Sequence, residues 1–203
     1  GQSVTVGASI GIAVYPDNGE EIVSLLVAAD MAMYEAKSQG KNRAQFFSDE
    51  INRKIRASLH VEAELRDALT GDNEGLYVAY QPQVCAQSRK IIGFEALTRW
   101  TLPDGKSVSP AEFIPVAEKS GLIVDLGTWL IQRVCSDLSW LRQLGIDIDK
   151  VAINVSPREL IRGNAIVDNA CRTIRQFGEK IDRFQFEITE NALMAEGGAA
   201  VAR

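Results

Sequence analysis

The feature that most constrains this chain is the order of its apolar patterns after residue 76, where short apolar runs alternate with longer amphipathic stretches. Short runs are typical of buried strands, and apolar residues spaced three and four apart are typical of helices. Strands that alternate with helices form βα units around a parallel sheet. The expected strands are 77–84, 91–97, 151–155 and 184–188, and the expected helices are 111–118, 126–144 and 166–177.

Two differently patterned blocks precede this region. Residues 4–14 alternate apolar with small or polar side chains, which predicts a half-buried strand interrupted at Gly7 or Gly11. A helix over residues 22–36, closed by Gly40, and a short edge strand at 44–47 follow. Residues 48–70 carry one apolar stripe among charges, which predicts an amphipathic helix that could serve as a stiff linker. We therefore divide the chain into parts 1–47, 48–70 and 71–203.

The charge and the cysteines limit the class of protein. The net charge is −5, from 22 basic and 27 acidic residues, which argues against binding to a nucleic acid polymer. The three cysteines have no metal-site spacing and are odd in number, which favours reduced thiols in the cytoplasm. No apolar run approaches the roughly 20 residues of a membrane helix. We expect this region to be cytoplasmic, and a membrane anchor upstream in a longer parent protein is left open.

Oxygen-bearing side chains lie at or near the ends of several expected strands. Glu95 follows one apolar run, Asn154 follows a second and Glu187 follows a third. Because the carboxyl ends of parallel strands face one basin, these side chains could converge there. Two carboxylates and an amide suit a hard divalent cation such as Mg²⁺ or Mn²⁺. Ordinary solvation of strand ends is an equal alternative.

Two further side chains could face the same basin. Arg99 shares the strand parity of Glu95 and could grip a phosphate, although the pattern alone favours a surface arginine. Gln81 offers a donor and an acceptor that could meet a base edge, and a polar residue of a barrel is an equal alternative.

Several motifs give the chain a specific resemblance. Together the motifs of the third part resemble the EAL family of cyclic di-GMP phosphodiesterases: residues 81–84 (QPQV), 93–100 (GFEALTRW), 109–118 (SPAEFIPVAE), 154–157 (NVSP) and 187–190 (EITE). The first part is similar to the C-terminal part of a GGDEF diguanylate cyclase domain, through residues 9–13 (SIGIA), 29–37 (ADMAMYEAK) and 40–42 (GKN).

The resemblance implies a fold and a site. The fold is α/β: an incomplete (β/α)₈ barrel of the EAL type, a variant with one antiparallel strand, preceded by a linker helix and the α+β end of a GGDEF domain. It implies that Glu95, Asn154 and Glu187 are ligands of Mg²⁺ or Mn²⁺, with Glu95 catalytic. Gln81 and Arg99 match positions that contact a guanine base and a phosphate. The family's paired aspartates, a lysine and a further glutamate come after the end of this sequence, so we expect weak cation binding.

The first part carries a second, weaker implication. Lys37 and Lys41 resemble basic residues of the GGDEF family that contact a triphosphate, and a solvated helix end is an equal alternative. The GGDEF turn itself lies before Gly1 in the family, so we expect no cyclase activity from this chain.

The function implied for the parent protein is hydrolysis of cyclic di-GMP to linear pGpG with two divalent metals. The alternative is a catalytically inactive receptor for cyclic di-GMP in bacterial signalling. A third possibility is a regulatory GGDEF module that binds GTP when that domain is complete. The 203-residue chain alone is expected to be inactive and to associate as a homodimer.

Overall fold

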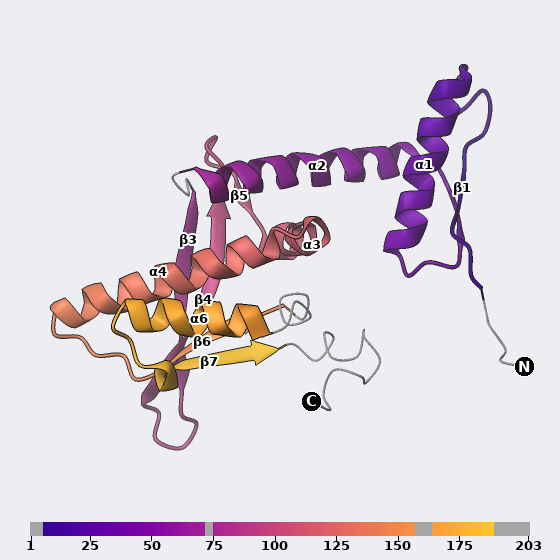
Figure 1. The fold of residues 1–203 in the computed structure, drawn as a ribbon. Helices are drawn as coiled ribbons and strands as arrows, with labels where there is room; N and C mark the ends of the chain where they lie inside the picture. The colour runs from indigo at the N-terminus through magenta and orange to yellow at the C-terminus, as the bar shows by residue number, and fades with distance from the viewer. Residues whose placement is uncertain (1–5, 72–74, 157–163, 189–203) are drawn as a thin grey trace, which may run out of the picture. The chain divides into compact units, whose positions relative to one another are not determined.

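The computed structural model describes residues 6–71, 75–156 and 164–188, and the chain divides into two compact units, 1–61 and 62–203. Figure 1 shows the order of the elements along the chain. Among the described residues, no helix combines the length and apolar character needed to cross a bilayer.

The first unit holds two short parallel strands and a helix. Strand β1 (Ile10–Ile12) pairs with β2 (Ala44–Phe46), and α1 (Ile22–Ser38) lies between them in sequence. Gly11 is required where β1 meets α1, because a Cβ there would lie 1.9 Å from the carbonyl oxygen of Ala29. The predicted strand 4–14 was too long: residues 6–9 are not strand, and residues 4 and 5 lie outside the described part. A strand persists only where a ladder partner exists, and β2 offers three residues.

The predicted amphipathic helix is α2 (Asp49–Thr70), which is continuous across the division between the two units. In the first unit, Lys54 of this helix forms an ion pair of 2.6 Å with Glu35 of α1, whose side chain is buried. Burial by itself would raise the pKa of Glu35, but hydrogen bonds from Lys54, Gln39 and Ser38 outweigh it and hold the pKa below its ordinary value.

The second unit is built on a mixed sheet. Its strands are β3 (Leu76–Val84), β4 (Ile91–Thr101), β5 (Ser107–Val108), β6 (Val151–Val155) and β7 (Phe184–Ile188). They lie in the order β3-β4-β6-β7, with β5 paired to β4. β3 and β4 are antiparallel, whereas β4, β6 and β7 are parallel. The α/β class and the antiparallel first strand are confirmed, although the short strand β5 is also antiparallel to β4. Over the described residues the sheet is open rather than a closed barrel.

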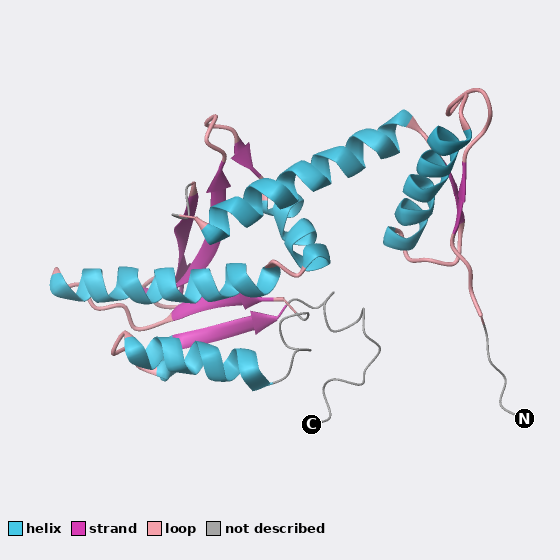
Figure 2. Ribbon diagram, turned by 45° about the horizontal axis from the view of Figure 1, so that its top comes forward, coloured by secondary structure: helices cyan, strands magenta, loops and turns pink. Residues whose placement is uncertain are grey.

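Helices cover one face of this sheet. They are α3 (Pro110–Ser120), α4 (Ile123–Gln143) and α6 (Asn164–Gln176), and the 3₁₀ turn η1 (Ile181–Arg183) leads into β7. Figure 2 shows α4 and α6 alongside the strands. The core between α4, α6 and the sheet consists of Ala96, Leu130, Ile131, Val134, Cys135, Leu138, Val151, Ile153, Ala170, Ile174 and Phe184. Since successive strand residues alternate between faces, the residues next to these core positions point to the opposite face.

Candidate functional site

The predicted site residues share the sheet face opposite the helices. Gln81 of β3 is the direct partner of Glu95 of β4, and Asn154 of β6 is the direct partner of Glu187 of β7. Glu95 pairs with Ala152, two residues before Asn154, so all four side chains lie on one face. Asn154 and Glu187 lie one residue before the ends of β6 and β7, as expected, whereas Glu95 lies in the middle of β4 because that strand continues to Thr101.

Two of these residues touch. The side-chain amide Nδ2 of Asn154 donates a hydrogen bond to Oε1 of Glu95 at 2.7 Å. Because the amide nitrogen points to Glu95, the geometry identifies which end of the Asn154 amide is oxygen and leaves that oxygen for another partner. On the neighbouring strand, Gln185 Nε2 donates to Oε1 of Glu187 at 3.2 Å. Sequence reasoning assigned no role to Gln185, although it precedes Glu187 by two residues and so has the same parity.

The oxygen atoms of these side chains can be compared with the ligands that a divalent cation prefers. Glu95 and Glu187 supply carboxylates and Asn154 supplies an amide oxygen, which are the donors that Mg²⁺ and Mn²⁺ prefer. No cluster of three His, Cys, Asp or Glu side chains occurs in the described parts of the chain. The residues present therefore fit a hard cation in kind, since Mg²⁺ usually keeps several waters in its shell of roughly six oxygens and needs only a few protein ligands.

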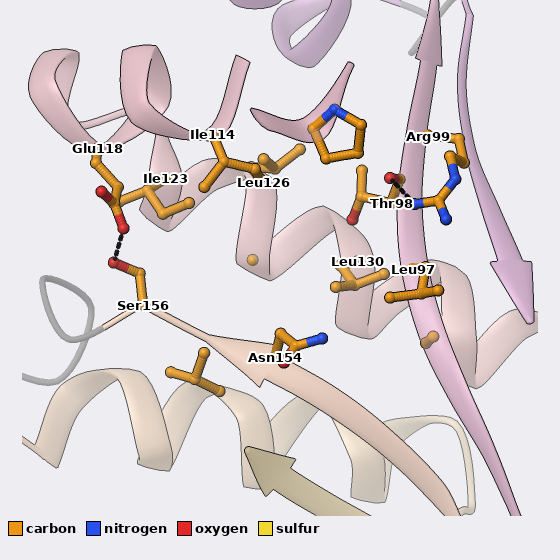
Figure 3. Close-up of a pocket in the computed structure, with 14 residues that line it drawn as sticks. Leu97, Thr98, Arg99, Ile114, Glu118, Ile123, Leu126, Leu130, Asn154 and Ser156 are labelled. Atoms are coloured by element: carbon orange, nitrogen blue, oxygen red, sulfur yellow. Dashed lines mark hydrogen bonds between the residues drawn. The ribbon is translucent and has the colours of Figure 1, made fainter. Parts of the chain in front are cut away.

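Arg99 lies on the extension of β4 beyond the predicted strand end. The strand continues to Thr101, and Arg99 pairs with Tyr77, so it shares the face of Glu95. Its guanidinium donates to the backbone carbonyl of Thr98 at 3.0 Å, as Figure 3 shows. A half-buried guanidinium that holds one backbone oxygen keeps further N–H donors for a phosphate.

A pocket of about 230 Å³ opens beside these strand ends. Arg99 and Asn154 line it, whereas Gln81, Glu95 and Glu187 do not. Its remaining lining comes largely from apolar residues of α3 and α4, including Ile114, Leu126 and Leu130 (Figure 3). The pocket therefore places Arg99 and Asn154 on one wall opposite apolar side chains of the two helices.

One contact at this pocket involves residues to which sequence reasoning gave no role. Ser156, just beyond β6, donates from Oγ to Oε1 of Glu118 on α3 at 2.7 Å (Figure 3). Both residues lie inside the motifs 109–118 and 154–157. Their membership of those motifs was the available signal, because nothing local in the sequence links positions 38 residues apart.

The two lysines of the first part lie in the first unit. Lys37 is exposed in the last turn of α1, where a cation complements the helix dipole. Lys41 has a positive φ of 61°, and its backbone N–H donates to the carbonyl of Ala36 at 3.1 Å, which closes the helix after Gly40. The position of Lys37 and the backbone hydrogen bond of Lys41 give both residues a role at the helix end, and a triphosphate contact stays a prediction.

Sequence models of known domains match both parts of the chain. The EAL domain matches residues 62–202, and the GGDEF domain of diguanylate cyclases matches residues 1–43. An uncharacterized signaling protein of Caulobacter vibrioides is 38% identical over 97% of this chain and 23% of its own length. The bifunctional diguanylate cyclase/cyclic di-GMP phosphodiesterase MucR of Pseudomonas aeruginosa is 35% identical over 98% of this chain and 28% of its own length. The chain thus spans about a quarter of these relatives.

A solved structure shows the same likeness in three dimensions. The PaMucR phosphodiesterase in a c-di-GMP complex superimposes with a TM-score of 0.61 and 30% identity, covering 70% of this chain and 56% of that chain.

Proposed function

The chain belongs to the EAL domain family, preceded by the end of a GGDEF domain, and we propose that the complete protein containing it hydrolyses cyclic di-GMP to linear pGpG. The observation that carries this proposal is the hydrogen bond between Asn154 and Glu95, beside Glu187 on the same sheet face. It joins oxygen-bearing side chains of two neighbouring parallel strands on one face of the sheet, near the carboxyl end of β6, and α/β folds assemble their sites at such strand ends. The names of MucR and of its solved complex support cyclic di-GMP as the ligand.

We assign a role to each residue at this edge. Glu95, Asn154 and Glu187 would hold Mg²⁺ or Mn²⁺, with Glu95 as the catalytic ligand. Divalent cations held there would neutralise phosphoryl charge and lower the pKa of water. Gln81, exposed on β3 opposite Glu95, would meet a guanine base edge, and Arg99 would bind a phosphate oxygen.

The proposed reaction is the hydrolysis of one phosphodiester bond of cyclic di-GMP. The oxygen of water forms a bond to one phosphorus, the bond from that phosphorus to the 3′-oxygen breaks, and the released 3′-oxygen takes a proton. Asn154 contributes by holding the Glu95 carboxylate in one orientation before substrate arrives. Preorganised charge of this kind stabilises the transition state without reorganisation during the reaction.

We propose that the chain has three parts. Residues 1–47 form the end of a GGDEF domain, 48–70 a linker helix and 71–203 the first half of an EAL domain. We expect the 203-residue chain alone to bind cation weakly and to show no turnover. Binding of GTP by a complete GGDEF domain and assembly as a homodimer stay predictions.

The test uses the complete protein, purified with Mn²⁺ and assayed for conversion of cyclic di-GMP to pGpG by chromatography. Glu95→Ala should lower the rate by at least about 10²-fold, because it removes a preorganised charge at the reacting centre. Glu112→Ala is the matched control, since Glu112 is an exposed carboxylate on α3. Wild-type turnover by Glu95→Ala would overturn the proposal. Binding of cyclic di-GMP by the wild-type protein without turnover would show an inactive receptor instead.

A further inference from the structure

Glu118 sits on a helix that is firmly placed. Ser109 caps α3 by accepting a hydrogen bond from the backbone N–H of Ala111, Pro110 occupies the first turn, and Gly121 ends the helix with a φ of 85°. Phe113 and Ala117 are fully buried. A helix with both ends specified and its apolar face buried holds its last turn, and therefore Glu118, in a defined position.

The same helix is braced against the strand that carries Glu95. The ring of Phe113 meets the ring of Trp100 edge to face, with centroids 5.7 Å apart and an interplanar angle of 83°. Trp100 is 1% exposed and lies on β4, five residues after Glu95. Because α3 is fixed to β4, any group that α3 holds is also held relative to Glu95.

The end of β6 is paired on one side only, because its ladder with β7 runs to Val155 while its ladder with β4 stops earlier. The ladder between β4 and β6 ends with the pair Ala96 and Ile153, one residue before Asn154. Asn154 is exposed, and Ser156 already lies beyond the strand. The hydrogen bond from Ser156 to the Glu118 carboxylate ties this strand end to α3, and a hydroxyl donating to a carboxylate is stronger than a neutral pair.

We infer that Glu118 is a positioning residue of the cation site: through Ser156 it fixes the end of β6 so that Asn154 is presented to Glu95. The contacts close a ring, from β4 through Trp100 and Phe113 to α3, through Glu118 and Ser156 to β6, and through Asn154 back to Glu95. Glu118 itself is not placed on the cation. This inference rests on the proposed function, because it assigns Glu118 to the same site.

The test measures Mn²⁺ binding without substrate, using the complete protein and the electron paramagnetic resonance signal of free Mn²⁺. Glu95→Ala supplies the background from other Mn²⁺ sites. Glu118→Ala and Ser156→Ala should each weaken the Glu95-dependent affinity by about tenfold, as expected for a supporting contact behind a ligand. Glu118→Gln should recover most of the affinity, because its amide oxygen still accepts from Ser156. In the double variant the combined loss should be less than the sum of the two single losses, since both changes remove the hydrogen bond between Ser156 and Glu118.

Two controls separate positioning from general damage. The hydroxyl of Ser120 donates to the carbonyls of Val116 and Ala117 within α3 and not to the end of β6. Ser120→Ala should therefore bind Mn²⁺ as the wild type does. Glu112→Ala should do the same. The inference is overturned if Glu118→Ala and Ser156→Ala keep wild-type Mn²⁺ affinity while Glu95→Ala loses it, and the proposed site then still stands. If Glu95→Ala and Asn154→Ala also keep wild-type affinity, the cation site itself is wrong.

Discussion

Asn154 donates a hydrogen bond of 2.7 Å to the Glu95 carboxylate across 59 residues of sequence. The two residues lie on neighbouring parallel strands, and their side chains meet just past the end of the ladder that joins those strands. This pair joins two side chains of the proposed cation site directly.

Replacing Asn154 by leucine should raise the Mn²⁺ concentration needed for half-maximal hydrolysis by at least about tenfold. Leucine has a similar volume but supplies neither the oxygen for a cation nor the N–H that orients Glu95. The measurement is a Mn²⁺ titration of pGpG formation by the complete protein. Gln143→Leu, at the exposed end of α4, is the control and should leave the titration unchanged. An unchanged titration for Asn154→Leu would remove Asn154 from the site.

Arg99→Lys should raise KM for cyclic di-GMP and leave kcat nearly unchanged. Lysine keeps the charge but loses the planar fork of donors that binds phosphate. Loss of one charged hydrogen bond, about 1.5 kcal/mol, corresponds to about tenfold in KM. Steady-state kinetics of the complete protein measure both constants, with Arg133→Lys on the exposed face of α4 as control. A fall in kcat with constant KM would contradict a ground-state phosphate contact.

Arg142→Met should destabilise the second unit by about 2–4 kcal/mol, less than for a fully buried pair because Arg142 is partly exposed. Arg142 pairs with Glu179, whose side chain is fully buried. Within the described residues, Glu179 Oε2 is buried without a hydrogen-bond partner, and the Nη1 atom of Arg183 lies 3.9 Å from it as a longer ion pair. Urea unfolding followed by circular dichroism measures the loss. The double variant Arg142→Met/Glu179→Gln should recover part of it, since no charge is left buried. Failure to recover would locate the loss in packing of the arginine stem.

The first unit should lose stability in acid, because protonation of Glu35 removes its ion pair with Lys54. The pKa of Glu35 lies below its ordinary value of 4.5 in the folded state, so the unfolded carboxyl binds its proton first as pH falls. The stabilisation is therefore complete above about pH 4.5 and is lost as pH falls through the folded pKa. Lys54→Met should flatten this dependence and cost about 1 kcal/mol at pH 7, because the lysine is exposed.

Thermal melts of the complete protein between pH 3 and pH 7 check this prediction, read through a probe in the first unit. Lys37→Met is the control, since Lys37 is likewise an exposed lysine of the first unit but lies on α1, and over the described residues it forms no ion pair with Glu35. An identical pH dependence in wild type and Lys54→Met would show that Ser38 and Gln39, which also donate to Glu35, carry the effect.

Much of the fold was predictable because local patterns carry it. The strands at 151–155 and 184–188 have the predicted bounds, and α2 and α6 lie within two residues of theirs. The strand expected at 91–97 continues to Thr101, since pairing with β3 and β5 extends it. The short strand β5 and the turn η1 were not predicted. Two or three residues have too little periodicity to be recognised in a sequence.

The sequence by itself determined which oxygen-bearing residues share one face of their strands, because side chains alternate with a period of two. The tertiary structure decided which of those side chains touch. The bond from Asn154 to Glu95, the tie from Ser156 to Glu118 and the pairing of Arg142 with Glu179 join residues 59, 38 and 37 positions apart. Such contacts depend on how helices pack against the sheet, and packing is a property of the whole core rather than of any local stretch.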